Sequence, residues 1–227
     1  MKKIIALILA VLMLVSMVAC GNTNDNDVSN NGETTNNVAG NETNADSNAP
    51  EVAPSKSAVE VINGAIGKFC EVLAATFEMS AEDVKGSFVG GYFSDDETTI
   101  TMGEAAKHPV NVQESVEALK TFSLMTDAEI AKIDDAATLY HMMNTNNFSA
   151  SAMRVVDAGE VDAFADTMKS LISNNRWMCG FPERYLVVKV DTCVISVYGL
   201  TDNVNAFKTA LTETYDNAVV VCDEAFA

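Results

Sequence analysis

The chain has 227 residues, and its 32 acidic side chains outnumber its 14 lysines and arginines, which gives a formal charge of −18. Such a negative field repels phosphate backbones and anionic headgroups, so nucleic acid is excluded as a partner and electrostatic attachment to a membrane is excluded as well. Five cysteines and two histidines occur without the spacing of a metal-ligand motif, so neither a metal nor a cofactor is expected.

Residues 1–19 predict a secretory signal. Two lysines precede an apolar run over 4–18, which is shorter than the roughly 20 residues of a membrane span. The sequence Met-Val-Ala-Cys-Gly at 17–21 resembles the bacterial lipobox, with Met17 where leucine is usual. The resemblance implies that the signal is removed and that the Cys20 thiol carries lipid. The alternative is an ordinary signal peptide that leaves a free cysteine at this position.

A lipid on Cys20 would hold the mature protein at the extracytoplasmic face of the cell membrane, with the covalent lipid as its only membrane contact. The segment that follows, 20–56, holds ten asparagines and no aromatic residue, leucine or isoleucine. It cannot bury enough apolar surface to offset the entropy of ordering, so we expect a disordered linker with a reach of roughly 30 to 35 Å.

Residues 57–227 suit a single domain with a hydrophobic core, and they carry 26 acidic and 11 basic side chains. The domain opens with a helix over 57–79, because Ser57 and Glu60 have capping-box spacing. An apolar stripe of helical period supports the helix. The stripe comprises Val59, Ile62, Ile66, Phe69, Leu73 and Phe77.

The next segment, 80–112, is irregular. Ser80 and Asp83 could start a short helix, glycines interrupt it, and 98–102 is a candidate strand. From Val112 to Met143 the pattern predicts mainly helix, with a second capping box at 126–129.

The last eighty residues predict strand, helix, strand, strand, helix, strand. The ranges are 149–156, 160–172, 185–190, 193–198, 202–215 and 218–222, with Asp191-Thr192 as a hairpin turn and the last strand buried. This order is that of the ferredoxin-like split β-α-β-β-α-β unit, over about 148–224. We therefore expect an α+β domain with strand order 4-1-3-2, amphipathic helices before the unit, and both of its helices on one face. In that order 185–190 lies at a sheet edge, where a second copy could pair to form a weak homodimer.

Four cysteines remain in the domain, at 70, 179, 193 and 222. Two disulfides with three connectivities are open to an exported protein, but we favour buried free thiols, because Cys70 lies on a helix stripe and Cys193 and Cys222 lie in apolar strands. In the expected sheet the first strand separates Cys193 from Cys222, too far apart for a disulfide.

The segment Asn175 to Arg184, with the hairpin and the helix after it, looks like the C-terminal part of a family of uncharacterised Gram-positive-type bacterial lipoproteins. The similarity covers about 137–221 together with the lipobox and the spacer. No activity is assigned to that family, so the resemblance implies a location and a domain type.

Within this segment, Trp177 and Cys179 are the candidate interaction residues, because the only tryptophan and a cysteine occur together with Gly180 and Pro182. In one interpretation Trp177 anchors a partner and Cys179 is a thiolate assisted by Arg176 and Arg184. In the other, which we favour, Trp177 packs under the sheet and Cys179 is a buried thiol that only fills space, since the C-terminal end of a helix disfavours a thiolate.

The other chemistry-bearing residues match no motif. His141 with Met142 and Met143 superficially suggests a soft-metal site, but packing is the commoner role of such a group, and His108 stands alone. The acidic pairs at 95–97 and 134–135 lack the spacing of a calcium loop. Gly86 to Gly90 has its serine one place too early for a nucleophile elbow, so no catalytic residue is assigned.

Three functions therefore compete. The first is a non-enzymatic binding or interaction domain at the cell envelope, which contacts an unidentified envelope protein or ligand through the sheet or through 80–112. The second is an enzyme with a thiol site near Cys179. The third is a small-molecule receptor associated with a transporter, for which one compact domain is small.

Overall fold

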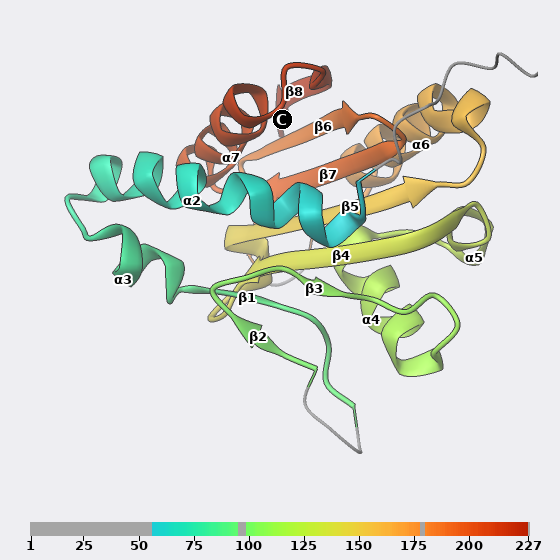
Figure 1. The fold of residues 1–227 in the computed structure, drawn as a ribbon, viewed down its shortest axis with the longest axis horizontal. Helices are drawn as coiled ribbons and strands as arrows, with labels where there is room; N and C mark the ends of the chain where they lie inside the picture. The colour runs from blue at the N-terminus through green and yellow to red at the C-terminus, as the bar shows by residue number, and fades with distance from the viewer. Residues whose placement is uncertain (1–55, 95–98, 178–179, 227) are drawn as a thin grey trace, which may run out of the picture. The chain divides into compact units, whose positions relative to one another are not determined.

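The computed structural model describes residues 56–94, 99–177 and 180–226, which belong to one compact unit. The predicted signal, Cys20, the predicted linker up to residue 55, Cys179 and the acidic residues 95–97 lie outside the described residues. The unit combines helices with an antiparallel sheet, which confirms the α+β class (Figure 1).

The first helix, α2 (Ala58–Phe77), begins at the predicted capping box. Ser57 N donates to Glu60 Oε2 (2.8 Å), and Glu60 N donates back to Ser57 Oγ (3.3 Å). A buried carboxylate adds a tertiary cap, because Ala58 N donates to Asp135 Oδ2 (2.8 Å). The helix therefore starts where the sequence predicts, and its apolar stripe faces the sheet.

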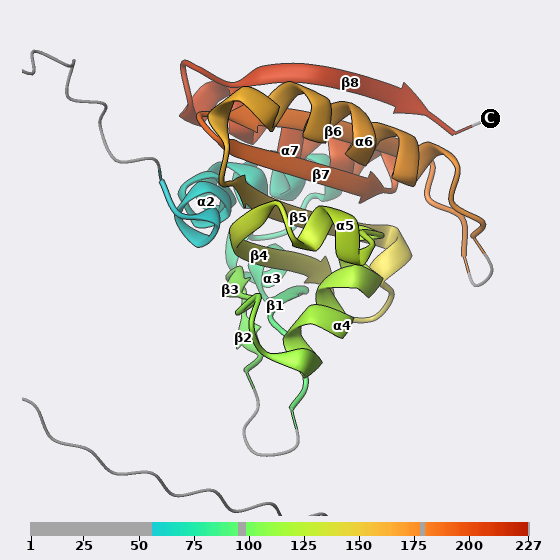
Figure 2. The ribbon, with the colours of Figure 1, turned by 90° about the vertical axis from the view of Figure 1, so that its right-hand side faces the viewer.

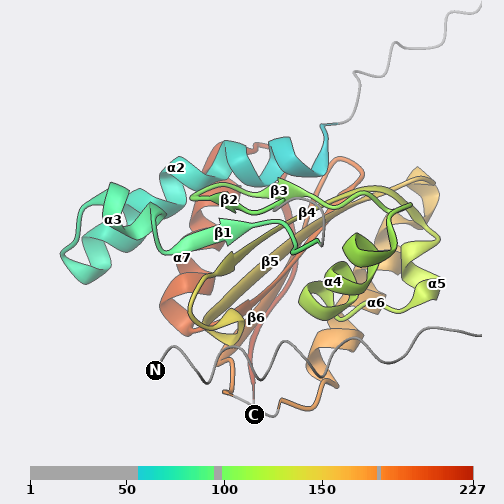
Figure 3. The ribbon, with the colours of Figure 1, turned by 90° about the horizontal axis from the view of Figure 1, so that it is seen from below.

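A short helix and three short strands follow α2, and then two helices. Figure 3 looks onto the side of the sheet that these strands form beside β4. The elements are α3 (Ala81–Lys85), β1 (Phe88–Gly90), β2 (Thr101–Met102), β3 (Ala106–Lys107), α4 (Gln113–Ser123) and α5 (Asp127–Ile130). Ser80 caps α3 and Thr126 caps α5, as predicted.

The prediction of helix up to Met143 was wrong in its second half, because Ile133–His141 forms β4, a nine-residue strand. Its residues from Asp135 to Tyr140 are all buried, so the strand shows no polar alternation that would reveal it. Residues with good helix propensity, such as Ala136 and Ala137, add to the ambiguity. Packing on both faces of the sheet decides the conformation.

The second half of the domain confirms the predicted order of elements. The elements are η1 (Thr145–Asn147), β5 (Phe148–Val155), η2 (Ala158–Glu160), α6 (Val161–Ser173), β6 (Arg184–Val190), β7 (Cys193–Gly199), α7 (Thr201–Thr214) and β8 (Val219–Ala225). The β6–β7 hairpin turns at Asp191 and Thr192, and Asp191 has a positive φ of 52°.

The sheet does not have the predicted ferredoxin-like order. Its strands run β2-β1-β4-β5-β7-β6-β8, with β3 also paired to β4, and every pair is antiparallel. The ferredoxin-like unit requires the last strand beside the first, which here is β5. Strand β4 already occupies that edge of β5, so β8 pairs with β6 on the far side.

This strand order also places α6 and α7 on opposite faces, whereas one common face was expected. Helix α6 connects β5 to β6 across β7, and α7 connects β7 to β8 across β6. Each connection therefore joins two parallel strands, and both move in the same direction along the sheet. Because β5 and β7 run in opposite directions, two right-handed crossovers must lie on opposite sides. Figure 2 shows α2 and α7 behind the sheet and α4, α5 and α6 in front of it. Two separate apolar cores result, one on each face.

The edge strand is β8, not β6, which lies between β7 and β8. The expectation of an edge at 185–190, and with it the proposed pairing of copies there, is therefore wrong. The last strand was also expected to be buried, yet most of its residues are exposed. Charged contacts hold it on both sides of the sheet. Asp223 accepts from Arg184 Nε (2.5 Å) and Lys208 Nζ (2.7 Å), and Glu224 accepts from Tyr185 Oη (2.5 Å) and Lys169 Nζ (2.6 Å).

The three described cysteines are buried free thiols, as predicted. Burial raises the pKa of Cys70 to about 11, of Cys193 to about 12 and of Cys222 to about 11, so all three are poor nucleophiles. Cys193 and Cys222 belong to the cores on opposite faces, and the strand between them is β6 rather than the first strand of the unit.

Candidate functional site

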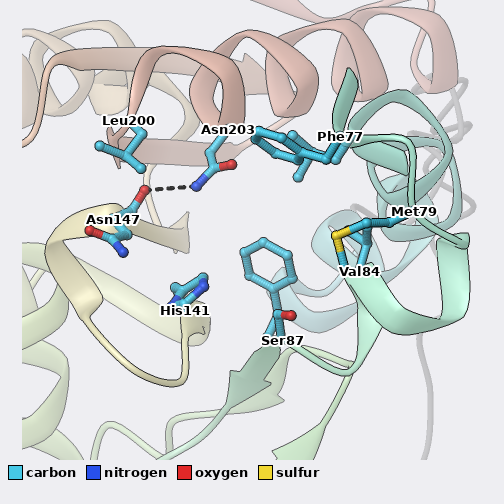
Figure 4. Close-up of a pocket in the computed structure, with 10 residues that line it drawn as sticks. Phe77, Met79, Val84, Ser87, His141, Asn147, Leu200 and Asn203 are labelled. Carbon is cyan, nitrogen blue, oxygen red and sulfur yellow. Dashed lines mark hydrogen bonds between the residues drawn. The ribbon is translucent and has the colours of Figure 1, made fainter. Parts of the chain in front are cut away.

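A pocket of about 180 Å³ lies at one end of the sheet, between the end of α2, the start of β1, the end of β4 and the start of α7. Figure 4 shows Leu200 and Asn203 opposite Ser87 and His141, with Phe77 and Met79 to one side. The lining residues are Leu73, Phe77, Met79, Val84, Ser87, Phe88, His141, Asn147, Leu200 and Asn203.

The chain reverses direction beside the pocket because α2 ends abruptly. Glu78 adopts the left-handed conformation (φ 53°, ψ 39°), and its N–H donates to Ala74 O. Met79 N donates to the same carbonyl oxygen (3.1 Å), and Ser80 then caps α3. This turn lifts Phe77 and Met79 out of the core, so that both side chains are 49% exposed.

The floor of the pocket is apolar and rigid. Leu73, Val84 and Phe88 are each at most 4% exposed. Phe88 packs edge-on against Phe69 (5.0 Å between ring centroids) and Phe148 (5.3 Å), and the same rings continue into the core. Edge-to-face packing of this kind fixes the rings, so the floor does not depend on a ligand for its shape.

The rim of the pocket exposes apolar side chains to solvent. Phe77 and Met79, each half-exposed, form this rim, and the backbone N–H of Met142 donates to O of the lining residue Ser87 (3.0 Å). Flexible thioethers adapt to irregular partner surfaces, and exposed apolar groups around a hollow are typical of binding sites.

The opposite wall supplies a few fixed polar groups. Asn203 is 6% exposed, and its Nδ2 donates to Asn147 O (2.9 Å), which also accepts from Leu200 N (2.9 Å). Met143 N donates to His141 Nδ1 (3.3 Å), so neutral His141 carries its proton on Nε2. Burial lowers the pKa of His141, which favours this neutral form. Amide and imidazole groups can orient a ligand, but among the described lining residues there is no carboxylate or thiol to pair with His141 in acid–base chemistry.

His108 is not part of this pocket. It lies on the opposite face of the sheet and is fully buried. Its Nδ1–H donates to Ser115 O (3.2 Å), and Thr138 Oγ1–H donates to its Nε2 (2.7 Å). Burial lowers the pKa of His108 to about 4, so the ring is a neutral structural bridge between α4 and β4.

The candidate residues from the sequence lie elsewhere as well. Trp177 follows α6 and packs on Tyr198 (4.7 Å between ring centroids) and Phe226 (5.6 Å), which supports its interpretation as a plug on one sheet face. Its indole nitrogen is buried without a hydrogen-bond partner. A hollow of about 610 Å³ lies beside it, next to the exposed Phe181. Cys179 is outside the described residues, and Arg184 pairs with Asp223, so nothing shows an activated thiol.

The other candidate groups have structural partners. Asp134 pairs with Arg154 (2.8 Å), and Asp135 caps α2 and pairs with Lys107 (3.2 Å). Across the described residues, no three His, Cys, Asp or Glu side chains converge as metal ligands would. Within the same ranges, every helix is too short or too polar to cross a lipid bilayer.

The sequence did not single out the pocket. Its walls come from three segments that are distant in the chain, 73–88, 141–147 and 200–203, and Phe77 looks like the last core residue of the α2 stripe. The one local signal is Ser80, whose capping position implies a chain reversal directly after Phe77. Comparison with protein-family models, with curated proteins and with solved structures gave no match.

Proposed function

We propose that this protein is a non-enzymatic, lipid-anchored binding protein at the extracytoplasmic face of the cell membrane, with Cys20 as its lipid attachment site. The lipobox-like sequence at 17–21, the short apolar run before it and the asparagine-rich linker support the anchor. The same features support membership of the lipoprotein family that the sequence resembles.

The observation that carries a binding role is the preformed apolar pocket with half-exposed Phe77 and Met79 at its rim. Sites for small organic ligands usually measure about 300 to 1,000 Å³, whereas this pocket has about 180 Å³. In another protein, a cavity of about 150 Å³ holds benzene. The volume of this pocket therefore suits one aromatic or branched side chain of a partner protein better than a whole metabolite, and the hollow of about 610 Å³ beside Trp177 keeps the transporter-receptor alternative in second place.

The anchor is tested by growing cells with an alkyne-tagged fatty acid and purifying the protein. We expect tagged lipid on a peptide that begins at Cys20, and no label on Cys20→Ser. An unmodified Cys20 thiol in the exported protein, or an intact signal, would refute the anchor.

The pocket is tested with the full chain in detergent and N-acetyl-phenylalaninamide as the probe, by isothermal titration. Phe77→Ala should weaken binding by about three- to tenfold, because it removes apolar contact at the rim. Phe77 is half-exposed, so the fold should survive the change.

Phe93→Ala is the matched control, since Phe93 is 77% exposed and does not line the pocket. It should leave the affinity unchanged. Equal losses in the two variants would show that the probe adsorbs to exposed rings in general, and the binding role of the pocket would then be rejected.

A further inference from the structure

Exposed carboxylates flank the apolar pocket on two of its three lining segments. Glu78 lies between the lining residues Phe77 and Met79, Glu82 and Asp83 lie just before Val84, and Asp202 lies just before Asn203. All four carboxylates are exposed. Residues with exposed carboxylates thus adjoin, along the chain, the residues that line the apolar hollow.

These four carboxylates form no ion pair among the described residues. Most of the basic side chains there are already paired with other acidic residues. Within 77–88 and 200–203, Lys85 is the single basic residue, and it pairs with Glu104 (3.6 Å). The negative charge beside the lining residues is therefore not balanced within these ranges, and it adds to the field of a strongly acidic domain.

We propose that the occupant of the pocket is an apolar side chain carried by a lysine- or arginine-rich segment of another polypeptide. The inference rests on the proposed binding function and names the chemistry of the partner. An apolar side chain fills the hollow, cationic neighbours meet the four carboxylates, and the amides of Asn147 and Asn203 can bond the partner's backbone.

Charge argues against the other occupants. An anionic lipid headgroup, or a second copy of this acidic chain, would bring like charge to these carboxylates. Exposed ion pairs each contribute little affinity, so the carboxylates act mainly by selecting a basic partner and accelerating its association. The apolar contact then sets how long the complex lasts.

The test uses the full chain in detergent and three synthetic pentapeptides, each blocked at both ends. The first has a central phenylalanine between two pairs of lysines, the second has glutamates in place of the lysines, and the third is the lysine peptide with a central alanine. We expect the first peptide to bind at least about tenfold more tightly than either of the others. Its affinity should fall by about tenfold between about 0.05 M and about 0.5 M salt, because salt screens exposed charge.

A triple variant locates the charge effect. Glu78→Gln, Glu82→Gln and Asp202→Asn together should weaken the lysine–phenylalanine peptide by about five- to tenfold. The matched control is Glu114→Gln, Asp166→Asn and Asp216→Asn, which makes the same change in net charge at exposed sites on α4, on α6 and beyond α7. The control should change the affinity by less than about twofold.

The outcomes separate the inference from the function on which it rests. If the glutamate peptide binds as tightly as the lysine peptide, and both need phenylalanine, the pocket function stands and the basic partner is refuted. If the two triple variants weaken binding equally, net charge alone is responsible, and the local carboxylates are refuted. If phenylalanine and alanine peptides bind alike, the apolar pocket is not the site, and both proposals fail. Tighter binding of vesicles of anionic lipid than of the lysine–phenylalanine peptide would also refute the basic partner.

Discussion

His108 is an imidazole whose burial favours the neutral ring. In the neutral ring, Ser115 O accepts from Nδ1–H and the Thr138 hydroxyl donates to Nε2, so a second proton would have to be held in the apolar interior with that hydroxyl reversed. Burial lowers the pKa of His108 from 6.5 to about 4. The folded-state pKa thus lies below the unfolded one, and the unfolded chain takes up the proton first as pH falls from 6.5 to 4. The free energy of unfolding should decrease over this range.

On acidification from pH 7 to pH 5, we expect protonation of His108 in the unfolded chain to lower the free energy of unfolding by about 2 kcal/mol, measured by urea titration. Gln at this position can still donate and accept but cannot titrate. The loss on acidification should therefore be about 2 kcal/mol smaller in His108→Gln than in the natural chain. Equal losses in the two proteins would show that His108 does not titrate in this way.

At the scale of elements, the contact between α2 and α7 depends on a glycine. Tyr215 follows α7, and its hydroxyl donates to Val61 O (2.9 Å) of α2. A Cβ atom on Gly64 would overlap this hydroxyl, whereas a Cβ on Gly67, one turn further along α2, would meet nothing within 4 Å. The two glycines occur in the same helix but in different surroundings.

Alanine should consequently have opposite effects at these two sites. Gly67→Ala should raise the free energy of unfolding by about 0.5 to 1 kcal/mol, through helix propensity alone. Gly64→Ala should lower it by about 1 to 3 kcal/mol, because the added methyl displaces Tyr215. Thermal or urea unfolding measures both changes. Tyr215→Phe combined with Gly64→Ala should recover part of the loss, and a stabilising effect of Gly64→Ala alone would disprove the clash.

Elements with local signals could be predicted from the sequence. Capping residues at Ser57, Ser80 and Thr126 located three helix starts, and two apolar runs rich in β-branched residues on either side of Asp191-Thr192 located the β6–β7 hairpin. β4 carries no such signal, because it is buried on both faces and, unlike β6 and β7, it has few β-branched residues and two adjacent alanines that favour helix. The failure to predict β4 left one edge of β5 apparently free, and the ferredoxin-like order followed from that error.

At the scale of the whole molecule, the sheet order creates the pocket. β4 runs next to β5 and beside β1, which brings His141 and Phe88 together (5.7 Å between ring centroids). Helix α7 lies on the same face as α2, so Asn203 closes the hollow from the other side. No local pattern encodes these long-range placements, and for that reason the sequence pointed to Trp177 instead.

The most direct test of the binding role is the position of a bound side chain. The full chain, with labelled methyl groups, is mixed with the pentapeptide that has a central phenylalanine between lysines, and intermolecular nuclear Overhauser effects are recorded. We expect the peptide ring to contact the methyl groups of Leu73, Val84 and Leu200, which line the pocket. Contacts from the ring to the exposed Val219 and Val220 of β8, with none to these three residues, would contradict the assignment of the site.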